Sequence, residues 1–206
     1  MAGLRIAVLG AGNIGGNLGK KWAAAGHTVA FGVTDPNGQR AKRVRDALGT
    51  AASIGSAADA LAAGDVVLMA VPGAAMDETI AANAGQLDGK TIIDAANRMG
   101  GGPMNSFATF RARTPNARVY RAFNCYGWEN FADPNFGGVQ ADMFYCGPEG
   151  EGRAVVEQLI ADAGLRPMRV GDADQVDVVD SVARLWFALA NGQRMGRQLA
   201  FKVLTR

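Results

Sequence analysis

A glycine motif close to the N-terminus constrains the fold of this chain more than any other feature. It reads Gly10-Ala-Gly-Asn-Ile-Gly15 and directly follows a short apolar run, Leu4–Leu9, which predicts a β-strand. It opens a segment in which Ile14, Leu18 and Trp22 recur every four residues, which predicts a helix with one buried face. A G-x-G-x-x-G motif between a strand and a helix is typical of a dinucleotide-binding βαβ unit.

Each glycine of the motif has a physical role in such a unit. Gly10 permits the tight turn, Gly12 lets the backbone approach a pyrophosphate, and Gly15 lets the helix pack closely on the strand. The first N–H groups of the helix and the positive end of its dipole attract phosphate charge. We therefore predict that a nicotinamide dinucleotide binds at this turn; the alternative is a glycine-rich turn without a ligand.

The rest of the chain alternates short β-branched runs with helical stretches, which is typical of a parallel sheet covered on both faces. We predict an α/β fold with a Rossmann-type, doubly wound, mostly parallel sheet and C-terminal helices. The expected strands are Leu4–Leu9, Thr28–Gly32, Asp65–Val71, Thr91–Ala95, Arg118–Phe123, Asp142–Cys146 and Arg166–Val170. The expected helices run from the glycine turn to about Ala25 and over Gln39–Leu48, Ser56–Ala63 and Glu151–Ala163.

The 206 residues favour a single domain over residues 1–206. The glycine-rich segment Arg98–Asn116 is expected to be a functional loop or a short irregular helix. Residues 175–204 are expected to form one or two helices, broken near Asn191-Gly192, that either cap the sheet or pair two subunits in a homodimer. One face of this segment is apolar, with Val182, Leu185, Trp186 and Leu189.

Composition narrows the class of partner. The chain has 21 basic and 19 acidic residues and a net charge of +2, so we expect a small-molecule partner and neither nucleic acid nor a membrane. The apolar runs are shorter than the roughly 18 residues of a membrane span, so we expect a cytosolic protein. The single His27 and the widely spaced Cys125 and Cys146 predict no metal site, a local structural role for His27, and buried reduced thiols.

The end of the second expected strand bears on the choice between NAD and NADP. An acidic residue there favours NAD, whereas Arg, Ser or Thr favours the 2′-phosphate of NADP. Here Val33 stands where the acid is expected and Thr34 follows it, while Arg40 lies on the next helix. Asp35 argues for NAD. We predict NADP(H); the alternative for the basic residues is a solvated helix face.

Several further motifs occur in a characteristic order along the chain. They are Gly12–Gly16, Ala25–Val29, Val71-Pro72, Arg121–Asn124, Phe144–Gly147 and Ala163–Pro167. In this order and spacing the chain resembles, over nearly its whole length, the NADPH-dependent reductases of the coenzyme F420 type. It is also similar to the cytosolic reductase domain of the membrane ferric reductases.

The resemblance implies that the dinucleotide crosses the C-terminal edge of the sheet. The positions matching the family's pyrophosphate contacts are Ala11, Asn13 and Ile14. Those matching its nicotinamide side are Val71 and Pro72, and those that close the pocket are Ala122 and Asn124.

One departure from the family concerns the adenosine end of the cofactor. The family commonly has Ser-Arg or Arg-Arg where this chain has Val33-Thr34, which leaves Arg40 as the substitute contact to the 2′-phosphate.

The reaction that the resemblance implies is hydride transfer between NADP(H) and coenzyme F420 or a flavin-like acceptor such as FMN or FAD. This transfer requires two stacked ring systems and no obligatory acid or base, so we assign no catalytic residue. Candidates for the platform under the second ring are Met76, Phe123, Tyr126, Trp128 and Met195, with core packing as the alternative for each. Two other functions stay open: an NADPH-dependent reductase of free flavin, a quinone or a ferric chelate, and a dinucleotide-sensing module without turnover.

Overall fold

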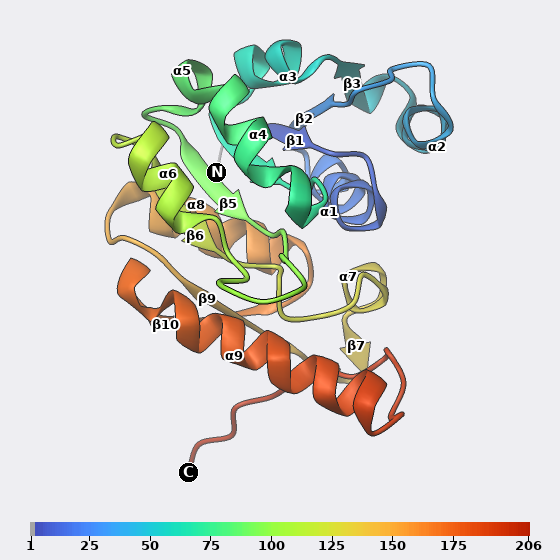
Figure 1. Cartoon of the computed structure of the whole chain (residues 1–206). Coiled ribbons are helices and arrows are strands. Elements are labelled where there is room, and N and C mark those ends of the chain that lie inside the picture. Colours follow the sequence, from blue (N-terminus) through green and yellow to red (C-terminus); the bar gives the residue numbers. More distant parts are fainter. Residues whose placement is uncertain (1–2) are drawn as a thin grey trace. The chain divides into compact units, whose positions relative to one another are not determined.

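The computed structural model describes residues 3–206, which divide into two compact units. Unit 1 ends at Val119, and unit 2 comprises Tyr120–Arg206. The elements coloured blue to green in Figure 1 belong to unit 1, and those coloured yellow to red belong to unit 2. The single domain expected over residues 1–206 stays a prediction.

Unit 1 alternates strands and helices along the chain, as the sequence pattern predicts. Its strands are β1 (Arg5–Leu9), β2 (Thr28–Gly32), β3 (Ala52–Gly55), β4 (Val66–Met69) and β5 (Thr91–Asp94). Its helices are α1 (Asn13–Ala24), α2 (Gln39–Leu48), α3 (Ala57–Ala63), α4 (Met76–Ala82), α5 (Ala84–Leu87) and α6 (Phe107–Arg113). Short 3-10 turns cover Gly49–Ala51 and Gly73–Ala75.

The strands of unit 1 form a parallel sheet in the order β5-β4-β1-β2-β3. The chain moves outward from β1 to β2 and β3 and then returns to β4 on the other side of β1. The winding therefore reverses between β1 and β4, and this is the topological switch point at which open α/β sheets bind ligands. The predicted Rossmann-type, doubly wound α/β fold is confirmed.

Helices cover both faces of this sheet. On one face, the buried side chains of α3, α4, α5 and α6 form a cluster with alternate strand residues such as Leu9 and Met69. On the other face, α1 approaches the sheet so closely that a Cβ atom at Gly19 would lie 2.3 Å from the Phe31 ring. Because β4 is covered on both sides, all its residues are buried, as its unbroken apolar run predicts.

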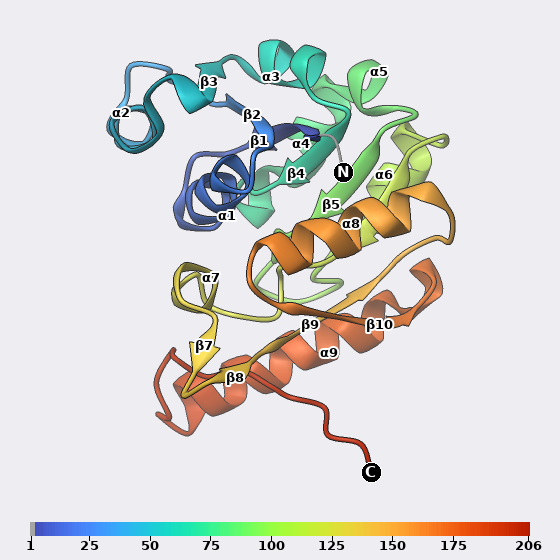
Figure 2. The same cartoon turned by 180° about the vertical axis from the view of Figure 1, so that it is seen from behind.

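Unit 2 is smaller and is built around two parallel strands, β9 (Asp142–Cys146) and β10 (Arg166–Gly171). Helices α8 (Glu151–Asp162) and α9 (Val176–Phe187) lie on opposite faces of this pair (Figures 1 and 2). Strand β6 (Arg118–Arg121) begins in unit 1 and ends in unit 2. The remaining elements of unit 2 are α7 (Glu129–Ala132), the hairpin β7 (Asn135–Phe136) and β8 (Val139–Gln140), a 3-10 turn (Ala173–Gln175) and a π-helical turn (Ala188–Gly192). Arg121 of β6 pairs antiparallel with Cys146 of β9.

The expected C-terminal helix is wrong beyond Gly192. Residues 193–206, here called the tail, form neither helix nor strand. Arg194 and Gly196 adopt left-handed φ angles of +57° and +86°, which an α-helix does not permit. The tail instead bonds to the start of β9: the Asp142 N–H donates to Phe201 O at 3.0 Å, and the Val203 N–H donates to Asp142 Oδ2 at 2.7 Å.

Three smaller expectations can be compared with the structure. Cys125 and Cys146 are buried free thiols, as predicted, and burial raises the pKa of each to about 12. His27 has the predicted local role, since its Nδ1 accepts a hydrogen bond from the Leu4 N–H at 3.0 Å. Among the helices of residues 3–206, none combines the length and the apolar character that crossing a membrane requires.

Candidate dinucleotide site

The turn after β1 is shaped by Gly10. Its φ is +108°, and a Cβ atom there would lie 2.5 Å from Ala70 O, so only glycine fits without displacing the backbone. Its N–H donates to Gly32 O at the end of β2 at 3.0 Å. The glycine turn therefore lies against the ends of both strands that neighbour β1, at the switch point of the sheet.

Gly12 and Gly15 have opposite surroundings. A Cβ atom at Gly15 would lie 2.0 Å from Gly10 O and 2.9 Å from Val8 Cγ1, which shows how closely α1 packs on β1. A Cβ atom at Gly12 would meet no protein atom within 4 Å. Gly15 is thus required by the fold itself, whereas Gly12 faces open space that a ligand can enter.

The N-terminus of α1 is suited to an anion. Gly12 is the N-cap, no side chain caps this end, and the first turn holds no acidic residue. The first N–H groups of a helix have no partner within the helix, and they carry the positive end of its dipole. Asn13 is exposed, and Ala11 and Ile14 are partly exposed. These residues can hold a pyrophosphate through their backbone N–H groups.

The end of β2 carries the residues expected at the adenosine side. The Val33 N–H donates to Gly55 O at 3.0 Å, which fixes the strand end, and Thr34 is exposed. Asp35 Oδ1 accepts from the Asn37 N–H at 3.0 Å, so this carboxylate stabilises its own turn. The side chain whose charge argues for NAD is thereby engaged locally.

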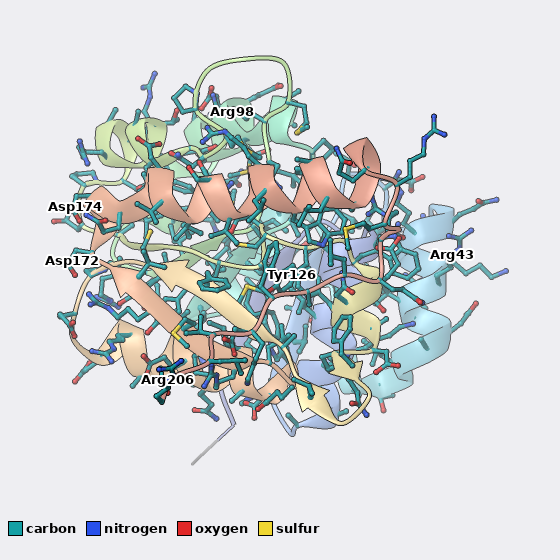
Figure 3. All side chains as sticks on the ribbon, turned by 90° about the horizontal axis from the view of Figure 1, so that it is seen from below. Arg43, Arg98, Tyr126, Asp172, Asp174 and Arg206 are labelled. Carbon is teal, nitrogen blue, oxygen red and sulfur yellow. The ribbon has the colours of Figure 1, made fainter. Side chains whose placement is uncertain are left out.

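Helix α2 presents a basic surface next to this turn. It buries Ala41 and Val44, and its exposed basic residues are Arg40, Lys42, Arg43 and Arg45. The helix packs against α1, and Arg43 extends outward from it in Figure 3. Arg45 donates to Pro36 O at 3.0 Å, whereas the exposed Arg40 lies in the first turn of α2. Arg40 is therefore the basic residue nearest in sequence to Thr34.

Three predicted site residues follow β4, and they differ in exposure: Val71 and Pro72 have surface, whereas Met76 is buried. The Ala70 N–H donates to Leu9 O at 2.9 Å, which holds this strand end beside the glycine turn. Val71 is partly buried and Pro72 is exposed, so both have surface at this edge. Met76 is 0% exposed within the hydrophobic cluster of unit 1. Its position is that of a core residue, and it offers no surface to a ligand.

The loop after β5 borders the same edge, because a Cβ atom at Gly73 would lie 2.2 Å from Asn97 O. Buried Asp94 accepts from the N–H groups of Ala96 and Ser106, at 3.1 and 2.9 Å. Arg98, labelled in Figure 3, donates to Ser106 Oγ at 3.0 Å and pairs with Asp77. The segment Arg98–Asn116 is thus an anchored loop followed by the short helix α6, in agreement with the sequence.

Arg98 and Thr109 both donate to the Asp77 carboxylate. The hydrogen bond from Thr109 and then that from Arg98 lower the pKa of Asp77 below its ordinary value, so the carboxylate stays ionised and holds the base of the loop.

The two remaining predicted site residues belong to unit 2. Ala122 and Asn124 are 0% and 2% exposed. The Asn124 amide donates to Asp180 Oδ1 at 3.2 Å, and the same oxygen accepts from Arg121 Nε at 2.8 Å. Between them Phe123 has a φ of +60°, an uncommon conformation for a bulky residue. This strained backbone is held by buried packing against Phe131, with ring centroids 5.7 Å apart.

The structure therefore brings together, in unit 1, the glycine turn, Val33-Thr34 and Val71-Pro72. Sequence reasoning missed Asp180, which orients Asn124 from α9, and Asp94, which anchors the loop after β5. One signal for Asp180 was present: it lies between Val179 and Ala183 on the buried face of an amphipathic helix, where a charge requires a partner.

Comparisons with known proteins agree with the sequence motifs. Residues 5–98 match the family model described as NADP oxidoreductase, coenzyme F420-dependent. No curated protein sequence matches the chain significantly. Among solved structures, a chain from Arthrobacter sp. FB24, provisionally named an F420-dependent NADP reductase, superposes with a TM-score of 0.83 at 24% identity, over 98% of this chain and 100% of that chain.

Two further structures illustrate how widely this fold is used. The hypothetical protein SMa0349 from Sinorhizobium meliloti has a TM-score of 0.65 at 28% identity, over 82% of this chain and 85% of that chain. A reductive aminase from Aspergillus terreus, in complex with NADPH and ethyl-5-oxohexanoate, has a TM-score of 0.63 at 21% identity; the match covers 93% of this chain but only 61% of the aminase. This family and the NADPH-bound neighbour are NADP-dependent oxidoreductases, the enzyme class that the sequence predicts. Over residues 5–98, with the glycine turn at its start, the chain is similar to the family of coenzyme F420-dependent NADP oxidoreductases.

Proposed function

We propose that this protein transfers a hydride between NADP(H) and coenzyme F420 or a flavin-like acceptor. The observation that carries the proposal is the open space over Gly12, at an uncapped helix N-terminus without acidic residues. This arrangement suits the pyrophosphate of a dinucleotide. The match of residues 5–98 to an NADP-dependent family supports the choice of cofactor.

The residues of unit 1 divide the binding of the cofactor among them. Backbone N–H groups at the start of α1 bind the pyrophosphate, with Gly12 leaving room for it. Thr34 and Arg40 bind the 2′-phosphate, since both are exposed and Asp35 is engaged in its own turn. Val71 and Pro72 contact the nicotinamide side.

The nicotinamide supplies the hydride when the cofactor is bound. The protein's contribution is to hold the ring in one orientation and to keep water from it. Within unit 2, Asp180 holds the amide of Asn124 in place. Within unit 1, Asp94 holds the loop after β5 through backbone N–H groups. We assign neither carboxylate a proton-transfer step.

The first experiment compares two glycine-to-alanine variants of α1 by fluorescence titration with NADPH. Gly12→Ala adds a methyl group into open space, so the protein folds while NADPH affinity falls by tenfold or more, about 1.4 kcal/mol. Gly16→Ala is the matched control, because its Cβ would meet only ordinary contacts, at 3.9 Å from Ala11 O. Equal affinity in both variants would contradict the proposed pyrophosphate site.

Arg40→Ala tests the preference for NADP. Loss of a hydrogen bond to a charged phosphate costs about 1.5–3 kcal/mol, so NADPH affinity should fall at least about tenfold while NADH affinity stays unchanged. Lys42→Ala is the control on the same exposed surface. Unchanged discrimination in Arg40→Ala would show that another group recognises the 2′-phosphate.

The acceptor is tested by stopped-flow absorbance of NADPH oxidation with oxidised F420, then FMN, then a quinone and a ferric chelate. Turnover with F420 or FMN supports the proposal. Turnover only with the quinone or the chelate selects a different reductase, and binding of NADPH without oxidation by any acceptor selects a dinucleotide-sensing module.

A further inference from the structure

The loop that follows β5 in unit 1 has an anchored base and an exposed tip. At the base, the Arg98 N–H donates to Met104 O at 2.9 Å, and the ion pair with Asp77 holds the Arg98 side chain. Met104 and the two residues after it are buried. Residues 99–103, here called the tip, are all exposed, and in Figure 3 the green loop beside the labelled Arg98 arches outward.

Three consecutive glycines determine the shape of the tip. Gly100, Gly101 and Gly102 have left-handed φ angles of +111°, +107° and +76°. Residues other than glycine rarely adopt such angles. A Cβ atom at any of the three positions would meet no atom of residues 3–206 within 4 Å. These glycines therefore give the tip its curvature without contributing to the core of unit 1.

Met99 gives the tip an apolar side chain. It is 70% exposed, and within residues 3–119 it is the only large apolar side chain that is exposed. The other four residues of the tip are glycine and proline, so the tip carries no charged side chain. The thioether of methionine is flexible and polarizable, and it makes favourable contacts with aromatic rings. The surface of the tip is therefore suited to a planar aromatic ligand rather than to a charged, hydrophilic one.

The loop begins beside the residues proposed to contact the nicotinamide. Strands β4 and β5 are parallel neighbours, so their carboxyl ends meet at the same edge of the sheet. A Cβ atom at Gly73 would lie 2.9 Å from Arg98 Cα, so the segments that follow the two strands are in contact. Hydride transfer requires the acceptor ring to lie against the nicotinamide. An acceptor bound beside Val71 and Pro72 therefore occupies the edge from which the loop extends.

We propose that Met99 contacts the ring of the acceptor and so selects planar ring acceptors over charged chelates. This inference rests on the proposed function, because it takes the nicotinamide to lie beside Val71 and Pro72. It assigns the tip to the binding of the acceptor and not to the binding of NADPH. Met99 is thus a specificity-determining residue, and the base of the loop positions it.

Steady-state kinetics of Met99→Ala test this role. Removal of the thioether should raise the KM for FMN or F420 about three- to tenfold. It should leave kcat within about twofold, because the contact holds the bound acceptor rather than the reacting atoms. The affinity for NADPH, measured by fluorescence titration, should not change. Any rate with ferric citrate should also stay the same.

Two further variants serve as controls for these kinetics. Met99→Leu keeps a large apolar side chain and should retain most of the affinity for the ring acceptor. Leu204→Ala removes an 86% exposed apolar side chain from the tail of unit 2 and should leave the KM unchanged. Both positions are exposed, and thermal melting should show that the variants fold like the wild-type chain.

Oxidation of methionine by peroxide tests the contact without turnover. The wild-type chain is treated with hydrogen peroxide in the presence of NADP+, with and without oxidised FMN, and sulfoxide formation is followed by mass spectrometry. NADP+ carries no hydride to transfer, so the acceptor binds without reacting. Bound FMN should slow the oxidation of Met99 at least about threefold, because susceptibility follows exposure. Met195, which is 61% exposed in unit 2, reports any general effect on the peroxide.

The outcomes separate this inference from the proposed function. If FMN or F420 oxidises NADPH but Met99→Ala leaves the KM unchanged, the role of Met99 is overturned and the proposed function stands. Oxidation of Met99 that FMN slows no more than that of Met195 overturns it as well. Weaker binding of NADPH by Met99→Ala would assign the tip to the cofactor instead and also overturns it. If no ring acceptor oxidises NADPH, the inference and the proposed function both fail.

Discussion

Unit 1 and unit 2 both contain buried apolar side chains, but the two units differ in how deeply an ion pair is buried. In unit 1 an apolar cluster unites strands and helices, and the Arg5–Asp65 ion pair is exposed, at 59% and 61%. In unit 2 the Arg121–Asp180 ion pair is 0% exposed at both side chains. Apolar periodicity can specify the packing of a cluster, whereas the buried ion pair depends on two individual charges far apart in the sequence.

The tail shows the same dependence of unit 2 on a single polar group. Buried Asp142 accepts from Arg166 Nε at 2.6 Å and from the Val203 N–H at 2.7 Å, and Lys202 Nζ lies 3.2 Å away. The Tyr126 hydroxyl accepts from the Phe201 N–H at 3.1 Å. The last residues are thus held by side chains of unit 2 rather than by a helix of their own.

The largest expected effect is on the buried ion pair of unit 2. Asp180→Ala leaves the Arg121 charge buried without this carboxylate, which costs about 3–5 kcal/mol of the free energy of unfolding. Asp65→Ala removes one partner of an exposed pair and should change stability little. Urea denaturation of both variants measures the difference; equal effects would remove the contrast between the two units.

The next effect tests the close packing of unit 1. A Cβ atom at Gly15 would lie 2.0 Å from Gly10 O, so Gly15→Ala should destabilise the chain by about 3 kcal/mol or more. Gly12→Ala has space for the methyl group and should lose at most about 1 kcal/mol as a poorer N-cap. Thermal melting compares the stabilities of the two variants. A clearly destabilised Gly12→Ala variant would contradict the finding that a Cβ atom at position 12 has open space around it.

The third prediction concerns pH and the tail. Burial raises the pKa of Asp142, but hydrogen bonds from Arg166, the Val203 N–H and Lys202 outweigh burial and lower it overall. The stabilisation is therefore present above the ordinary aspartate pKa of about 3.9 and is lost as the pH falls through the lower folded value.

Asp142→Asn should lose about 1.5–3 kcal/mol at neutral pH and flatten the acid branch of the stability curve. Hydrogen exchange at the Phe201 and Val203 amides should quicken in the variant, because the tail is released. Unchanged exchange at both amides would show that the tail is held by other contacts.

The smallest effect is at a helix cap of unit 1. Ser56 Oγ accepts from the Asp59 N–H at 3.1 Å, and Asp59 Oδ2 accepts from the Ser56 N–H at 2.9 Å, which forms a capping box. Ser56→Ala should lower the free energy of unfolding, measured by urea denaturation, by about 1 kcal/mol. Ser56→Thr should retain most of this stabilisation, because Thr also caps helices. If Ser56→Ala lowered the free energy of unfolding more than Gly15→Ala does, the expected order of the two effects would be wrong.

The sequence predicts the elements that depend on local patterns better than those that depend on contacts between distant residues. The glycine turn and both ends of α2 follow from local patterns of glycine and apolar residues, and they are found as predicted. Strand β4 lies within the expected strand Asp65–Val71 but is shorter. The expected C-terminal helices included the tail up to residue 204. Its actual path depends on Asp142, whose bond to the Val203 N–H spans 61 positions.

The hairpin formed by β7 and β8 was not predicted, although the sequence contains a local signal for it. Gly137 and Gly138, with φ of +62° and +87°, form the turn between β7 and β8, and a Gly-Gly pair between short strands is typical of a hairpin. The orientation of Asn124 had none, since Asp180 lies 56 positions away in the chain. Contacts of this range depend on the folded structure rather than on any local pattern.

Titration of the purified wild-type chain with NADPH and then with NADH, followed by fluorescence, tests the dinucleotide site most directly. We predict saturable binding of NADPH, at least about tenfold tighter than that of NADH, because we propose that Thr34 and Arg40 bind the 2′-phosphate. Equal or tighter binding of NADH would contradict the assignment of those two residues. Binding of neither cofactor would contradict the dinucleotide site itself.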